Sequence, residues 1–526
     1  MNNQSVLSLS TFKDSKQSLK SDMVSGFLVF LIALPLSLGI AKASGFPAAM
    51  GVLAAMVGGI FTTFFKVCDL SIKGPAAGLI TICSGAIMEF GGGEQGWKMT
   101  CAVIVVMAAI QILFAVLKVG SYGDFFPHSA IHGMLAAIGI IIISKQIPVL
   151  LGDEPSMYKG ESPIALLLDI PRFIVFAHWH IAAIGLLSAL IMFGIPFIKK
   201  NVIQKIPAPM IALILTIPLS IYWHFKQTEP DYSLVSIGDF WGSMGLHVDF
   251  SGITTLVFWK YVFMFLFINS LESLLTVKAV DQLDKTSRKS DPNGDLMGLG
   301  FANFLSGLLG GLPIISEVVR SSANIGFGAK TKWSNFFHGI FLLIVMLFLI
   351  PVIELIPNAT LAAMLIYAGF RLASPKEFAH TYQIGKEQLL VFLITIIVTL
   401  AEDLLVGVLT GILVEMIVYF LNGISYRNVF KAQYQIDQNT DETVIHVQGA
   451  AIFSNLISFK KILTKLTEKQ KVIFDVSQST LIDHSFMNFI RYFETEYNNG
   501  GGNFSVVGLE NLQGFSNHKL SGRRKK

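Results

Sequence analysis

The chain has 526 residues, of which 53% are hydrophobic and 14% are charged, and its 39 basic and 35 acidic side chains leave a net charge of +4. Soluble domains carry about 25% charged residues, so this composition excludes a purely soluble enzyme and a disordered chain. The charge is also too evenly balanced for a nucleic-acid-binding protein, which would carry a basic stripe. The class that remains is an α-helical polytopic membrane protein.

The chain begins with a polar stretch, residues 1–22, which we predict to be a cytoplasmic N-terminal tail. Residues 23–425 carry about fourteen hydrophobic segments and are predicted to form a transmembrane transport domain. A membrane-spanning helix needs about 20 apolar residues. Most segments are close to this length: 23–42, 46–65, 99–119, 128–150, 180–198, 206–225, 254–280, 335–356, 358–373, 387–401 and 403–422. Three others are short or broken by glycine and proline: 74–90, 296–311 and 313–325.

The charges between these segments indicate the orientation of the chain. Lys and Arg favour the cytoplasmic side of a membrane. Basic clusters follow the even-numbered segments, as at Arg288, Lys289 and Arg371, whereas acids such as Asp153 and Glu154 follow odd-numbered ones. We therefore predict a multi-pass protein of the cell (inner) membrane with both termini in the cytoplasm.

Two of the broken segments occupy equivalent places, each being the third of seven in its half of the domain. The first reads KGPAAGLITI from Lys73, and the second reads GGLPIISEVVRSSAN from Gly310. Paired broken segments at corresponding positions are typical of inverted-repeat transporters. The repeat is inferred from hydropathy, since the two halves share no sequence similarity that is visible by eye.

A helix that begins in mid-membrane exposes unpaired backbone N–H groups and the positive end of its dipole. Two such ends facing each other would form an anion site. Gly74, Pro75 and Gly78 suit a close backbone approach, and Pro313 suits the start of a helix. The alternative interpretation is a pair of ordinary kinks, because glycine and proline are common in membrane helices.

Charged residues within the segments sharpen this prediction, since charges in a bilayer are costly and usually functional. Glu272 and Thr276 are four residues apart and share one helix face. Glu317 and Arg320 lie on one ridge of the 313–325 segment. We expect Arg320 to attract the anion and Glu272 to bind Na+ or H+. Glu317 either takes part in coupling or serves only as the ion-pair partner of Arg320.

The sequence carries none of the motifs of enzymes or of ATP-driven pumps. It has no phosphate-binding loop, no HExxH and no nucleophile–base motif. Its three cysteines lie in or beside apolar runs without paired spacing, so neither a disulfide frame nor a metal site is expected. The one cofactor considered is Na+ as a coupling ion.

Three stretches resemble the SulP family, the sulfate permease-like anion transporters with a C-terminal STAS domain. They are LIALPLSLGIAKASGFPAAMG in the first segment, ESLLTVKAVDQLD in the eighth, and NGDLMGLGFANFLSGLLGGLPIISEVVRSSANIGFGAKTK in the ninth and tenth. The likeness covers nearly the whole chain. It implies a fold of seven plus seven transmembrane segments in an inverted repeat, divided into core and gate subdomains.

The resemblance also implies site residues. In the family the anion lies between the N-termini of the third and tenth helices, which match the following residues here: Pro75, Ala76, Ala77, Gly78, Ile314, Ile315 and Ser316. Glu272 and Thr276 match the acid and threonine that help hold the cation in sodium-dependent bicarbonate members. Arg320 matches an arginine beside the anion in prestin-like members. The chain departs from the family at Leu36, where many proton-coupled members carry an acid, and at Ile315 and Glu317.

The polar C-terminal region reads as an α/β domain. Residues 443–447, 472–476 and 504–508 have the pattern of strands, and residues 456–466 that of an amphipathic helix. The resemblance assigns residues 434–515 to a small cytoplasmic STAS domain that docks and stabilises a homodimer. Asp483 is followed by His484 rather than by the serine of phosphorylated STAS proteins, so phosphorylation there is not expected. The basic tail, residues 516–526, is expected to be disordered and to touch anionic lipid.

The leading hypothesis is a secondary active transporter of a small inorganic anion, sulfate or bicarbonate, coupled to Na+ or H+ and working by alternating access. The alternatives are a dicarboxylate or nucleobase carrier on the same fold, or a membrane sensor that signals through the STAS domain. The expected partners are the anion, membrane lipid, a second copy of the chain and a cytoplasmic partner of the STAS domain, with no nucleic acid.

Overall fold

The computed structural model describes residues 18–122, 127–154, 158, 161–198, 206–238, 240–242, 245–284, 286, 288–438, 442–466 and 471–526. Residues 1–17 of the predicted N-terminal tail lie outside this part of the chain. Contacts divide the chain into two compact units, Met1–Ser121 with Ile138–Leu372 and Tyr122–Ala137 with Ala373–Lys526. Each unit is described by itself.

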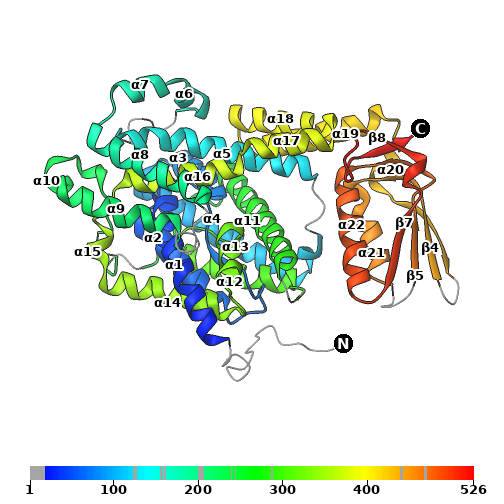
Figure 1. The fold of residues 1–526 in the computed structure, drawn as a ribbon, viewed down its shortest axis with the longest axis horizontal. Helices are drawn as coiled ribbons and strands as arrows, with labels where there is room; N and C mark the ends of the chain where they lie inside the picture. The colour runs from blue at the N-terminus through cyan, green and yellow to red at the C-terminus, as the bar shows by residue number, and fades with distance from the viewer. Residues whose placement is uncertain are drawn as a thin grey trace. The chain divides into compact units, whose positions relative to one another are not determined.

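Each predicted hydrophobic segment contains a helix (Figure 1). In the two segments at third position, a short strand precedes the helix. The first half consists of α1 (Leu19–Ala43), α2 (Ala48–Thr62), β1 (Ile72–Pro75), η1 (Ala77–Leu79), α3 (Ile80–Glu89), α4 (Gly93–Val116), η2 (Val119–Tyr122), α5 (His128–Leu151), α6 (Pro163–Leu168), α7 (Ile170–Val175), α8 (Trp179–Gly194), η4 (Ile195–Phe197), α9 (Ala208–Tyr222), α10 (Phe225–Thr228) and η6 (Asp231–Ser233).

The second half follows a similar order and includes two helices that hydropathy did not predict, the polar α17 and the short α20. It consists of α11 (Leu256–Leu283), α12 (Pro292–Leu308), β2 (Ile314–Glu317), α13 (Val318–Gly326), α14 (Trp333–Phe348), α15 (Ile350–Ile353), α16 (Asn358–Leu372), α17 (Pro375–Ile384), α18 (Lys386–Ala401), α19 (Leu404–Leu421) and α20 (Tyr426–Phe430).

Six described helices are long and apolar enough to cross a membrane: Leu19–Ala43, Gly93–Val116, His128–Leu151, Trp179–Phe197, Leu256–Asp281 and Leu404–Leu421. The shorter apolar helices include α2, α3, α9 and α14. Broken or shortened spans of this kind are tolerated in a membrane where the freed backbone groups are buried within protein.

The two broken segments meet in the first unit. Strand β1 pairs antiparallel with β2 over four residues, with Ile72 opposite Glu317 and Pro75 opposite Ile314. Helix α2 packs against β1, α11 and α12 pack against β2, and α14 contacts α1 and α2. The strands are therefore enclosed by helices from both halves of the chain.

One expectation about the second broken segment was wrong. Residues 314–316 were expected to form a helix N-terminus, but they are extended, and α13 begins only at Val318. The physical reason is that Ile315 stands opposite Gly74 in the β1–β2 ladder, the backbone of Ile314 bonds to side-chain amides, and β-branched side chains favour the extended conformation.

The C-terminal region folds as a mixed sheet with two helices on one face (Figure 1). Its elements are β3 (Gln433–Gln438), β4 (Glu442–Ala451), η7 (Phe453–Asn455), α21 (Leu456–Leu463), β5 (Lys471–Asp475), β6 (Ser479–Ile482), α22 (His484–Asn499), β7 (Asn503–Val507), η8 (Leu509–Asn511), β8 (Leu512–Gly514) and β9 (Arg523–Lys525). The strand order is β7-β5-β4-β6-β9-β8, and β3 also pairs with β4. The neighbours of β4 include the parallel strands β5 and β6. The chain crosses from β4 to β5 through α21, as parallel strands require, and β6 follows β5 after a short turn.

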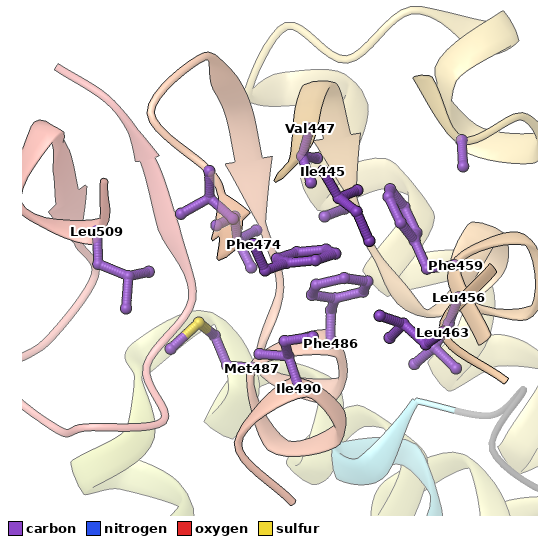
Figure 2. Close-up of a cluster of buried hydrophobic side chains, with 14 of the residues drawn as sticks. Ile445, Val447, Leu456, Phe459, Leu463, Phe474, Phe486, Met487, Ile490 and Leu509 are labelled. Atoms are coloured by element: carbon purple, nitrogen blue, oxygen red, sulfur yellow. The ribbon is translucent and has the colours of Figure 1, made fainter. Parts of the chain in front are cut away.

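The core of this domain is a phenylalanine cluster between the sheet and its helices. Phe474 and Phe486 stack with ring centroids 6.0 Å apart, and Phe459 meets Phe486 edge-on at 5.0 Å (Figure 2). Aromatic pairs in such geometries stabilise a core by about 0.5–1.5 kcal/mol beyond the area that they bury.

The basic tail was expected to be disordered, and this expectation was wrong. Residues 523–525 form β9, which pairs antiparallel with both β6 and β8. Ser521 is fully buried just before the strand. The tail is ordered because its backbone completes the sheet, a source of stability that its basic composition does not reveal.

Candidate functional site

The first broken segment turns from strand to helix at Pro75 and Ala76. Ala76 is extended and buried, the turn η1 starts at Ala77, and Leu79 N donates to Ala76 O at 3.2 Å. Proline at the end of β1 has no N–H to leave unpaired. The predicted residues Pro75 to Gly78 therefore surround the start of the third membrane helix.

Glu317 caps the other helix. Its Oε2 accepts the backbone N–H of Arg320 at 2.6 Å, so the carboxylate satisfies one of the free donors at the start of α13. The sequence predicted either a coupling role for Glu317 or an ion pair with Arg320. The contact observed is a helix cap on the backbone of Arg320, and a charge interaction with the Arg320 side chain accompanies it. A negative charge at a helix N-terminus is also favourable to the dipole.

Arg320 of α13 reaches the end of strand β1 and has donor groups that are not used in hydrogen bonds to the described residues. Its side chain is 1% exposed, and Nη2 donates to Pro75 O at 3.2 Å. Its Nε and Nη1 have no hydrogen-bond partner among the described residues. A Cβ added to Gly74 would lie 2.6 Å from Nη1, so glycine at this position makes room for the guanidinium. A buried guanidinium with two free donors is suited to receive an anion.

Glu272 of α11 faces the start of the third helix. Its Oε1 is buried and has no hydrogen-bond partner in the described part of the chain. A Cβ added to Gly78 would collide with this same oxygen, so glycine lets the carboxylate reach the turn. Thr276, one helical turn away, is also buried. The structure thus brings together β1, η1, Arg320 and Glu272, the elements that carry most of the predicted site residues.

Ile314, Ile315 and Ser316 line the same strand pair but differ in what they offer. The two isoleucine side chains are buried. The backbone of Ile314 is held by amides, since its N donates to Asn303 Oδ1 at 2.6 Å and its carbonyl accepts from Asn303 and Asn269. Ser316 Oγ is engaged in a separate polar network. Strand β2 therefore shapes the site, but the backbone of Ile314 and the hydroxyl of Ser316 are already engaged in hydrogen bonds.

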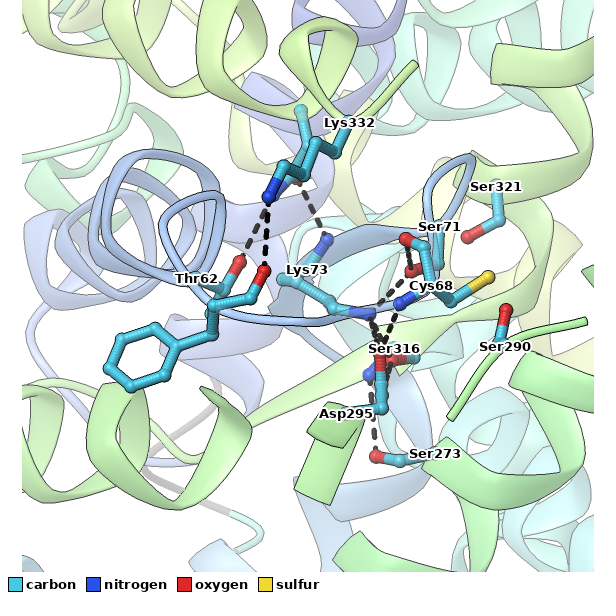
Figure 3. A network of polar contacts seen from close by, with 12 residues as sticks. Thr62, Cys68, Ser71, Lys73, Ser273, Ser290, Asp295, Ser316, Ser321 and Lys332 are labelled. Atoms are coloured by element: carbon cyan, nitrogen blue, oxygen red, sulfur yellow. Dashed lines mark hydrogen bonds and ion pairs between the residues drawn. The ribbon is translucent and has the colours of Figure 1, made fainter. Parts of the chain in front are cut away.

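That network holds a buried ion pair that sequence reasoning missed (Figure 3). Lys73 Nζ lies 2.6 Å from Asp295 Oδ1, and the two side chains are 0% and 1% exposed. Lys73 Nζ also donates to Ser316 Oγ at 2.7 Å and to Ser71 Oγ, and Ser316 Oγ donates to Asp295 Oδ2 at 2.9 Å. The available signal was a charge directly before each of two broken apolar segments, 74–90 and 296–311. The 222-residue separation gave no reason to pair them.

In the second unit, the last membrane helix meets the C-terminal domain through a buried phenol. Tyr419 Oη donates to Asp483 Oδ2 at 2.5 Å and lies 3.1 Å from Glu415 Oε1. Asp483 also caps α22 by accepting the N–H of Phe486, and it accepts the N–H of Phe453. Burial raises the pKa of Asp483 to about 6, an effect that these hydrogen bonds oppose. Ser485 is buried and its Oγ accepts His128 N.

Groups of three or more His, Cys, Asp or Glu that could hold a metal ion do not occur among the described residues. The groups that the site offers to a ligand are the buried guanidinium of Arg320, the carboxylate of Glu272 and the backbone N–H groups at the helix starts.

Comparison with known proteins bears on this arrangement. The model of the sulfate permease family matches residues 19–395. A putative sulfate transporter of Bacillus subtilis, YvdB, is 26% identical over 495 residues, covering 91% of this chain and 87% of the relative. The bicarbonate transporter BicA of Picosynechococcus sp. is 26% identical over 404 residues, covering 74% and 68%.

Solved structures share the fold. The transmembrane domain of a cyanobacterium bicarbonate transporter BicA matches with a TM-score of 0.65 and 25% identity, over 74% of this chain and 98% of that one. The murine Slc26a9 anion transporter in the inward-facing state matches with a TM-score of 0.71 at 16% identity, over 96% and 90%. The predicted fold class is confirmed: a 7+7 inverted-repeat membrane domain with core and gate subdomains and a small α/β STAS domain. The chain belongs to the sulfate permease family, a family of multi-pass membrane transporters and not of enzymes.

Proposed function

We propose that the chain is a secondary active transporter of sulfate or bicarbonate, coupled to Na+ or H+ and working by alternating access. The anion would bind where β1, η1 and β2 meet, at Pro75, Ala76, Ala77, Gly78, Ile314 and Ile315, with Ser316 behind. The observation that carries the proposal is the buried guanidinium of Arg320, two of whose donor nitrogens have no hydrogen-bond partner among the residues that the structure describes. The names of the relatives, a putative sulfate transporter and a bicarbonate transporter, supply the two anions.

Glu272 and Thr276 are proposed as the coupling-cation site. Because Glu272 Oε1 is buried and has no hydrogen-bond partner within the described ranges, a bound proton or Na+ would satisfy it. The carboxylate lies against the turn at Gly78, so the cation would sit beside the anion. Loading both ions would leave fewer uncompensated charges in the core than loading either one, which is the physical basis of coupling.

Uptake by proteoliposomes tests this function. Labelled sulfate and labelled bicarbonate would each be offered with an inward Na+ gradient, with an inward H+ gradient and with neither. We expect saturable uptake of one anion that rises with one of the gradients. Absence of uptake of both anions under all three conditions would refute the proposal, and uptake that ignores both gradients would refute coupling.

The placement of the protein is also a proposal. We place it in the cell membrane with both termini in the cytoplasm, as a homodimer stabilised by the STAS domain and surrounded by lipid. Cysteine labelling of intact cells at an introduced residue near position 526 tests the orientation, since a membrane-impermeant reagent should not reach it.

A further inference from the structure

The Lys73–Asp295 pair lies directly behind the proposed anion site. Lys73 belongs to β1 and stands opposite Ser316 of β2 in the strand register. Its chain neighbour is Gly74, where an added Cβ would lie 2.6 Å from Arg320 Nη1. Asp295 projects from the first turn of α12. The pair therefore connects both strands of the site to a third element.

The pair is saturated with hydrogen bonds, so it has no free group for a ligand. The three protons of Lys73 Nζ have three acceptors, on Ser71, Asp295 and Ser316. Asp295 accepts from Lys73 and from Cys68 N on Oδ1, and from Ser316 on Oδ2. A transported anion cannot contact either side chain without breaking this network (Figure 3).

What the pair does supply is charge close to the site. An ammonium and a carboxylate at 2.6 Å cancel each other at a distance, which leaves Arg320 as the dominant positive charge facing the anion. Removing one partner alone would leave a buried charge of one sign behind the strands. A unit charge about 10 Å from the anion, at an effective dielectric constant of about 20, changes a binding constant about tenfold.

We propose that Lys73 and Asp295 are positioning residues that set the electrostatic potential behind the anion site. Neutralising Lys73 then weakens anion binding, and neutralising Asp295 strengthens it. This inference rests on the proposed function, since it requires an anion at the strand pair. A role confined to holding β1 and β2 together makes a different prediction, because loss of either partner would then disturb the site in the same direction.

The test compares the KM for anion uptake of Lys73→Met and Asp295→Asn in proteoliposomes at neutral pH. Lys73→Met leaves an uncompensated carboxylate and should raise KM about tenfold. Asp295→Asn leaves an uncompensated ammonium and should lower KM by a similar factor, while slower release of the anion lowers the maximal rate. The double variant Lys73→Met/Asp295→Asn carries no net charge there and should return KM to within about threefold of the wild type.

Lys260→Met provides the matched control. Lys260 pairs with Glu89 at 3.0 Å, but this pair is partly exposed to its surroundings at side-chain exposures of 32% and 42%. Screening should leave the KM of this variant close to that of the wild type. Thermal unfolding of each purified variant shows whether the fold is retained, and the double variant keeps the test available if one single variant does not fold.

The outcomes separate the two ideas. If the wild-type protein transports neither anion, the proposed function fails and takes this inference with it. If the wild type transports but Lys73→Met and Asp295→Asn shift KM in the same direction, or leave it unchanged, only the electrostatic role fails. Opposite shifts with recovery in the double variant support it.

Discussion

At the scale of single residues, the site depends on polar groups that are buried without a full set of partners. Arg320 Nε and Nη1 and Glu272 Oε1 are such groups in the described part of the chain, and the two side chains lie beside Gly74 and Gly78 of the first broken segment. Leaving buried charged groups unsatisfied costs several kcal/mol in general. Groups of this kind persist where a ligand completes them, which is why these two carry the functional argument.

Arg320→Gln should weaken anion binding strongly. Each hydrogen bond to a charged group stabilises a complex by about 1.5–3 kcal/mol, so loss of the Arg320 guanidinium should raise the KM for the anion by at least about tenfold. The measurement is uptake at graded anion concentrations. Arg371→Gln, which removes an exposed arginine of α16, is the control and should transport normally. An unchanged KM in the Arg320 variant would remove it from the site.

Glu272→Gln should abolish the response of uptake to the Na+ or H+ gradient while the protein still folds. The amide has the shape of the carboxylate but neither its charge nor its proton-binding oxygen. Uptake with and without each gradient is the measurement, and monodispersity in detergent reports the fold. A variant that keeps the full response of the wild type would show that Glu272 does not hold the coupling ion.

At the scale of elements, hydropathy predicted the membrane helices well because burial in lipid imposes length and apolar composition. It missed α17, which mixes polar and apolar residues, the short helices α6 and α7, and the strands β1 and β2. Four-residue strands have no periodicity of their own, and their pairing depends on residues far apart in the chain. The Lys73–Asp295 pair was missed for the same reason. The sequence did predict that the residues around Pro75 lie beside the second broken segment, because glycine and proline mark the break in both segments.

Gly74→Ala tests the strand that carries the site. Its Cβ would lie 2.6 Å from Arg320 Nη1, the mobile end of a side chain, so we expect the guanidinium to shift and the strand to remain. KM for the anion should rise several-fold with little change in thermal stability. The matched control is Gly194→Ala, since a Cβ at Gly194 of α8 meets nothing within 4 Å. Loss of folding in the Gly74 variant without loss of affinity in its folded fraction would contradict this assignment.

At the scale of the whole chain, the second unit joins membrane helices to the C-terminal sheet through side chains that are fully buried. Tyr419 of α19 and Asp483 at the start of α22 are 2% and 3% exposed. The amino acid after Asp483 is His484, whose ring lies against Leu520 O and whose pKa burial lowers to about 4. The hydroxyl of the neighbouring Ser485 accepts a hydrogen bond from the backbone N–H of His128, so this loop serves as an attachment point between the helices and the STAS domain.

The attachment should depend on pH through Asp483. Its pKa in the folded protein, about 6, is above the ordinary value of 3.8, so the folded state binds its proton more tightly than the unfolded state does. The stability from this group is fully present below about pH 4 and is lost as the pH rises through about 6. Amide hydrogen exchange of α22 in the full-length protein should therefore speed up over that range, and Asp483→Asn should flatten the change.

Tyr419→Phe provides a second measure of the same contact. It leaves two buried carboxyl groups without their shared phenol, which should destabilise the attachment by about 1–3 kcal/mol. Exchange of α22 amides should then speed up at every pH, whereas Tyr426→Phe, at an exposed tyrosine of α20, should change nothing. Equal exchange in the two variants would mean that the phenol does not hold the domain.

The pairing of β1 with β2 also has a consequence for biosynthesis. The first strand leaves the ribosome long before its partner, and Gly74 has no opposite residue until Ile315 has been made. The exposed backbone of β1 must wait inside the bilayer or its translocation machinery while seven further spans are inserted. The β1–β2 pair, and with it the proposed anion site, can therefore form only after the chain has been made as far as Glu317.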